Sequence, residues 1–131
     1  MSVRRHSDWR NYERVVPNKE HTIHKDIKRA KTVKELNSIW YANYKKFNHV
    51  DIACWMVAVD SIVARGSLAM NLDVIDAIKT QVDTFTERSL YTLVYFICWH
   101  NWHEPELMNM IVARVNMIFD VLAQLLRVLD T

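Results

Sequence analysis

Glycine and proline are scarce in this sequence, with one glycine and two prolines among 131 residues. Average usage would supply roughly nine and six. Phosphate-cradling glycine loops, the turns of dinucleotide-binding folds and hairpin-rich sheets all depend on glycine. The scarcity therefore excludes those folds and favours an all-α protein.

Cysteine is also rare, and no apolar run is long enough to cross a membrane. Cys54 and Cys98 both lie in apolar stretches, which predicts two reduced core thiols. The first thirty residues lack the apolar segment of a secretory signal. The most hydrophobic stretch, residues 108–129, is interrupted by charged residues, so we expect no transmembrane segment.

Positive charge is unevenly distributed along the chain. Residues 1–46 carry twelve Lys or Arg against five Asp or Glu, whereas residues 47–131 carry five against ten. The net charge of +2 thus combines a portion of +7 with a portion of −5. This asymmetry predicts a basic N-terminal segment that contacts an anionic partner, either nucleic acid or an acidic protein surface.

Residues 1–31 show no sustained apolar period, and we expect an extended basic arm there, with room for a turn or two of helix. Lysine and arginine contact phosphates, while Trp9 and Tyr12 can stack on unpaired bases. For Trp40 and Tyr44 we favour a place in the core. The expected RNA contacts are Arg4, Arg5, Arg10, Arg14, Lys19, Lys25, Lys28, Arg29, Lys31, Lys45 and Lys46.

Residues 32–131 read as one helical domain, made of a hairpin over 32–66, a hairpin over 71–100 and a C-terminal helix over 105–129. Apolar residues recur at helical spacing in each segment. The segment boundaries carry the usual start and stop signals. These signals are capping boxes at 32–35 and 84–87, N-cap residues Asn48 and Asn71, Gly66 after a helix end, and Pro105 in a first turn.

The two hairpins resemble each other when the chain is shifted by 38 residues. Leu36 then falls on Val74, and Phe47 falls on Phe85. A two-helix period of this length is typical of an α-solenoid, in which each hairpin packs on its neighbour. An antiparallel four-helix bundle with equal loops would show the same coincidence and remains the alternative.

The segment ELNSIWYANYKKFNHVDIACWMVAVDSI, residues 35–62, resembles the helical-hairpin repeats of organellar octotricopeptide and heptatricopeptide repeat proteins. Similar repeats precede the RAP domain in FAST-kinase-like proteins. The resemblance extends over residues 33–100. It implies RNA binding, RNA processing or membership of a ribosome in a mitochondrion or plastid.

No set of residues predicts catalysis or metal binding. Cys98, His100 and His103 lie close together, but zinc normally requires a closely spaced cysteine pair that the chain lacks. Asp60 lies in an apolar helix, where we expect it to face a groove or Arg65. We therefore expect no enzyme activity, no metal, no cofactor and no small-molecule substrate.

The C-terminal helix is apolar around most of its circumference, with polar residues confined to one narrow stripe. The preceding hairpins can cover only one side, so we expect the helix to dock on another subunit. The predicted protein interface is Met108, Ile111, Val115, Ile118, Leu122, Leu125 and Leu129.

These features predict a structural subunit of a large mitochondrial ribonucleoprotein, and the one we favour is the mitochondrial ribosome in the matrix. The arm would contact the rRNA backbone, and the helices would contact neighbouring proteins. The N-terminal arginines resemble those of a mitochondrial targeting segment. The alternative is a protein-binding accessory subunit of a respiratory or ATP-synthase complex, without RNA contact.

Overall fold

The computed structural model describes residues 18–130, and every regular element in that range is helical. The all-α class is therefore confirmed. Two short 3-10 helices, Tyr44–Lys46 and Val82–Thr84, each precede a longer helix. The α-helices are α2 (Asn18–Arg29), α3 (Val33–Asn43), α4 (His49–Ile62), α5 (Leu72–Lys79), α6 (Glu87–His100) and α7 (Pro105–Asp130).

Helix α2 corrects the prediction of an extended arm for residues 18–29. Its side chains Ile23 and Ile27 are buried, and the helix packs against α3 and α4. Two apolar residues four positions apart line one face of a helix, but such a stripe is too short to stand out among charged neighbours. Residues 1–17 of the predicted arm lie outside the described residues.

Most helix starts agree with the capping signals. The Thr32 hydroxyl accepts a hydrogen bond from the Glu35 amide. Asn48 and Asp51 form a reciprocal capping box, and Asn71 accepts from two amides at the start of α5. These side chains bind amides that the first helical turn leaves unpaired.

Two boundary predictions are wrong. Helix α6 begins after Thr86, which forms a capping box with Ser89, whereas the Thr84 hydroxyl donates to the Gln81 carbonyl. Helix α4 ends at Ile62, before the expected glycine stop. Gly66 instead has φ 74° in the following loop, and its amide donates to the Trp99 carbonyl at the end of α6.

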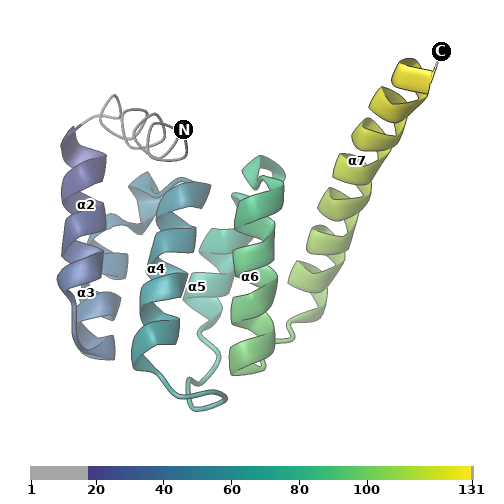
Figure 1. Ribbon diagram of the computed structural model, residues 1–131. Helices are drawn as coiled ribbons and strands as arrows, with labels where there is room; N and C mark the ends of the chain where they lie inside the picture. Colours follow the sequence, from purple (N-terminus) through teal and green to yellow (C-terminus); the bar gives the residue numbers. More distant parts are fainter. Residues whose placement is uncertain (1–17, 131) are drawn as a thin grey trace.

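Helices α2 to α6 form two layers (Figure 1), and the core lies between them. Figure 1 shows α2, α4 and α6 side by side, with α3 and α5 behind them. Large aromatic side chains fill the space between the layers, and the Trp55 indole donates to the buried Leu36 carbonyl at 2.8 Å. Burial of these rings supplies much of the apolar stabilisation of the fold.

The 38-residue repeat is present in the backbone as well as in the sequence. The two 3-10 helices are each followed by an extended phenylalanine and then by a 14-residue helix, and 38 residues separate the equivalent positions. Most side chains paired by the 38-residue shift share the same burial. In two pairs they differ, because Tyr44 and Val94 are exposed while their counterparts Val82 and Met56 are buried. Pairs buried in both units include Leu36 with Val74, Phe47 with Phe85, Ile52 with Leu90, and Trp55 with Leu93.

Candidate functional site

Helix α7 begins against the other helices and extends away from them toward its C-terminal end (Figure 1). Its first turns pack against α5, α6 and the second 3-10 helix, and Leu107 and Ile111 belong to the core. The C-terminal half extends beyond the other helices (Figure 1). About three turns of this half carry exposed large apolar side chains. The exposed fraction is 63% for Phe119 at the start of this stretch and 80% for Leu129 at its end.

The predicted interface on α7 is divided by the structure. Its members recur at alternating spacings of three and four, the a and d positions of a heptad, and we name the row the α7 seam: Met108, Ile111, Val115, Ile118, Leu122, Leu125 and Leu129. Ile111 is buried, and Met108, Val115 and Ile118 are half-buried where they pack against the core, so the chain itself covers much of this part of the seam. Only the last three residues of the seam are exposed.

Further exposed apolar residues of α7 lie outside the predicted interface. They occupy the e and g positions beside the seam, together with one c position. With the end of the seam they form a broad apolar face, whereas b, c and f positions in this half carry most of the polar residues. The additional residues are Val112, Met117, Phe119, Val121, Leu126 and Val128.

Polar contacts fix the direction in which α7 starts. The Glu104 carboxylate accepts a hydrogen bond from the Leu107 amide at 2.6 Å and forms an ion pair with Lys79 of α5 at 3.2 Å. The bond from the Leu107 amide lowers the pKa of Glu104, and Lys79 adds to this effect. About two turns beyond Leu107, Arg114 donates to the Phe85 carbonyl at 3.0 Å. These contacts hold the base of α7 against the second repeat.

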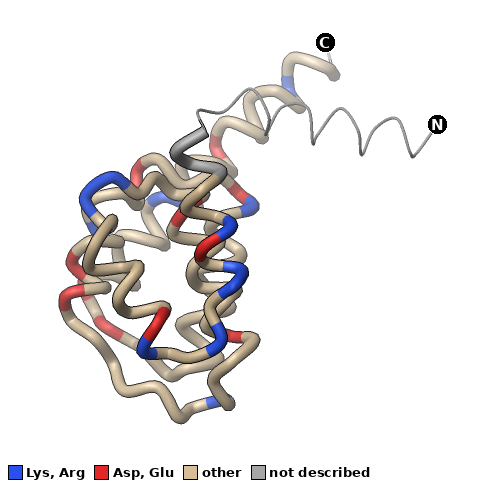
Figure 2. Tube along the Cα trace, turned by 90° about the vertical axis from the view of Figure 1, so that its left-hand side faces the viewer, with Lys and Arg blue, Asp and Glu red and all other residues tan. Residues whose placement is uncertain are grey.

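The basic residues form a charged surface rather than part of the core. Lys25, Lys28, Arg29 and Lys31 are exposed on or just after α2, and Lys45 and Lys46 are exposed after α3. Figure 2 shows acidic positions interspersed among the basic ones on this side of the molecule. The predicted contacts Arg4, Arg5, Arg10 and Arg14 lie outside the described residues, as does the side chain of Lys19.

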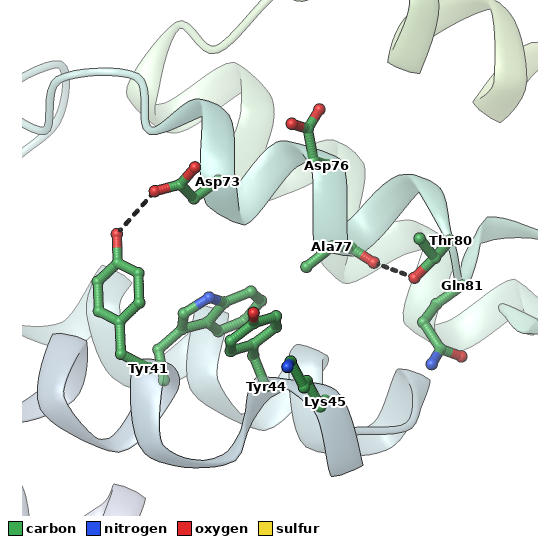
Figure 3. Close-up of a pocket in the computed structure, with 9 residues that line it drawn as sticks. Tyr41, Tyr44, Lys45, Asp73, Asp76, Ala77, Thr80 and Gln81 are labelled. Atoms are coloured by element: carbon green, nitrogen blue, oxygen red, sulfur yellow. Dashed lines mark hydrogen bonds between the residues drawn. The ribbon is translucent and has the colours of Figure 1, made fainter.

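A groove of about 560 Å³ separates α3 from α5. The prediction that Trp40 is a core residue is confirmed at 1% exposure, and the same prediction for Tyr44 is wrong, because its ring lines the groove at 37%. Tyr41 donates weakly to Asp73 at 3.5 Å. Figure 3 shows Asp76 turned away from both tyrosines. The acidic groups therefore do not converge, and the groove lacks the arrangement expected of an acid–base site.

Histidines link the helices of the first layer. His24 of α2 lies 2.6 Å from the buried Asp51 of α4, and His100 of α6 lies 2.7 Å from Asp60 of α4. His49 of α4 contacts Ser89 of α6 at 3.1 Å, and burial lowers the pKa of His49. Each pair joins neighbouring helices and holds them in register.

Several predictions for this region need correction. His100 is buried at the end of α6, and it, not Arg65, is the partner of Asp60. Arg65 instead lies over the Trp99 ring, 5.7 Å from its centre. Cys98 is exposed rather than part of the core. These errors share one cause, because spacing along the chain does not show which side of a helix is covered.

Among the side chains that the structure describes, those of residues 22–129, no group of three or more His, Cys, Asp or Glu has the geometry to hold a metal ion. Within the same range, no helix combines the length and apolar character needed to cross a membrane. Comparisons with protein-family models, curated proteins and solved structures found no match for this chain. The apolar face of α7 and the basic surface of α2 are therefore the two candidate functional surfaces.

Proposed function

We propose that this chain is a non-catalytic structural subunit of a large mitochondrial ribonucleoprotein. The observation that carries this proposal is the exposed apolar face on the C-terminal half of α7. A contiguous face of leucine, valine and phenylalanine is costly to leave in water, and surfaces of this kind are normally covered by another protein. In this function α7 binds the chain to a neighbouring protein through apolar contacts.

RNA is the anionic partner in this proposal. Exposed Lys25, Lys28 and Lys31 supply positive charge on and after α2, and the four N-terminal arginines add to it along the sequence. Contacts between such side chains and phosphates bind RNA without reading its sequence, and each contact steepens the salt dependence of binding. The rRNA of a mitochondrial ribosome is the RNA we favour.

The repeated backbone unit supports the resemblance to organellar helical-hairpin proteins. Each unit contains a 3-10 helix, a capped 14-residue helix and buried residues at matching positions. We propose that the two units form a short α-solenoid and that α7 begins the next turn of the same arrangement. This architecture and the N-terminal arginines are the reasons for proposing a mitochondrial assembly.

Charge reversal in the full chain tests RNA binding with a matched control. Lys28→Glu combined with Lys31→Glu changes the charge near α2, whereas Arg65→Glu combined with Arg127→Glu makes the same net change elsewhere on exposed residues. We expect the first pair to weaken binding to single-stranded RNA and to reduce its salt dependence, and the second pair to change both little. Equal weakening by both pairs would show that α2 is not the contact.

Copurification separates the proposal from its alternative. A tagged chain isolated from mitochondria should bring down rRNA together with ribosomal proteins. Recovery of respiratory or ATP-synthase subunits without RNA would instead favour the accessory-subunit function. Recovery of neither would contradict both proposals.

A further inference from the structure

The exposed end of the α7 seam continues an interface that the chain already uses. Met108, Ile111, Val115 and Ile118 pack against the core, and Leu122, Leu125 and Leu129 follow them in the same heptad register. A row of a and d residues that continues beyond its partner presents the surface on which another helix packs. The occupant of this surface is therefore expected to be helical and apolar.

The opposite end of the molecule does not offer such a surface. The apolar residues Ile23 and Ile27 of α2 are already buried, whereas Lys25, Lys28 and Arg29 are exposed. A second copy stacked head to tail would therefore place a charged helix against the apolar face of α7. Charged groups buried without partners are costly, so a continuous stack of copies is disfavoured.

We propose that the exposed half of α7 pairs in antiparallel fashion with the same helix of a second copy. In the register that aligns a positions with d positions, Leu122 faces Leu125 of the second copy, and Ile118 faces Leu129. A two-fold axis repeats both contacts, giving four apolar layers from two kinds of pair. The surface is self-complementary, which a symmetric dimer requires.

Charge and shape are compatible with this pairing. Asp120 and Arg127 occupy f positions, on the side of α7 farthest from the partner helix, so the pairing buries neither charge. Phe119 and Leu126 lie beside the seam and widen the apolar contact. Because the helices run in opposite directions, the two helical bodies lie at opposite ends of the paired segment. Their basic α2 surfaces would then be far apart, available to separate RNA segments.

This inference rests on the proposed structural function, because it names the chain that covers α7. The full chain should sediment as a dimer of twice 15.6 kDa and dissociate on dilution. Leu125→Asp places a carboxylate in the central layers and should yield a monomer. Gln124→Asp adds the same charge on the neighbouring outer position and should leave the dimer intact.

Circular dichroism of Leu125→Asp should match that of the parent chain, because Leu125 is 56% exposed in the monomer. A parent chain that stays monomeric at every concentration overturns the inference, as does a Leu125→Asp variant that remains dimeric. RNA binding measured on the same samples separates the two proposals. A monomer that binds RNA refutes only the dimer, and a dimer without RNA affinity refutes only the RNA function.

Disulfide trapping tests the register. In a chain with Cys54 and Cys98 replaced by alanine, Leu122→Cys and Leu125→Cys are introduced in separate preparations. Oxidation of the mixture should give cross-linked dimers faster than oxidation of either preparation alone. Faster cross-linking within each separate preparation would indicate parallel helices and would overturn the antiparallel pairing.

Discussion

The hydrogen-bonded pair of His100 and Asp60 provides a sharp test of the packing between α4 and α6. The two side chains meet at 2.7 Å, and the His100 side chain is completely buried. Its Nδ1 atom has no hydrogen-bond partner. The substitution Asp60→Ala therefore leaves a buried imidazole with neither nitrogen bonded.

The expected cost follows from this geometry. An unsatisfied buried polar group costs about 1–3 kcal/mol. Burial raises the pKa of Asp60 while the bond and charge of His100 oppose it, so the carboxylate itself carries a desolvation penalty. Because Asp60→Ala removes that penalty as well, we expect a loss near the lower end, about 1–2 kcal/mol.

Urea unfolding followed by circular dichroism measures this loss as a shift of the midpoint at constant slope. Asp76→Ala is the control, because it removes an exposed aspartate and should change the free energy of unfolding by less than about 0.5 kcal/mol. The double variant Asp60→Ala with His100→Phe removes both polar partners and places a ring against Phe96 and Trp102. It should be more stable than Asp60→Ala alone. The reasoning is refuted if Asp60→Ala matches the parent chain or if the double variant is the least stable.

Three further predictions concern the repeated phenylalanines, the contact of His49 with Ser89 between α4 and α6, and Glu104 at the base of α7. Phe47→Ala and Phe85→Ala should each cost about 3–5 kcal/mol in urea unfolding, since both rings are fully buried at equivalent positions; a cost confined to one would refute that equivalence. Because the folded pKa of His49 is lowered from 6.5, its contribution to stability is present above that value and is lost as pH falls through the folded pKa. Urea midpoints measured from pH 7.5 to 5 should therefore fall less for His49→Gln than for the parent chain, and parallel curves would contradict the assignment. Glu104→Gln should lower the midpoint at pH 7 and reduce the loss below pH 4.5, because the lowered pKa of Glu104 means that its contribution disappears on protonation; an unchanged midpoint at pH 7 would contradict its capping role.

Local signals predicted the helices where short-range chemistry decides their boundaries. Asn48 and Asn71 bind amides within three residues, and this arrangement can be recognised without knowing the fold. Helix α2 escaped prediction because only Ile23 and Ile27 reveal its buried face. Its stability comes from packing on α3 and α4, which is a tertiary effect.

The limits of the α7 surface depended on information absent from the local sequence. Heptad spacing predicted the seam, but the point at which the seam leaves the core depends on how far the neighbouring helices reach beside α7. Ile111 is buried and Leu125 exposed although their spacing is equivalent. The pairing of His100 with Asp60 spans 40 residues of sequence and likewise required the fold to be known.

The structure of the native particle purified through this chain would test the proposed function most directly. We predict that Leu122, Leu125 and Leu129 are covered by protein and that RNA phosphates lie against Lys25 and Lys28 of α2. A particle in which the end of α7 remains exposed to solvent and no RNA approaches α2 would contradict both parts of the proposal.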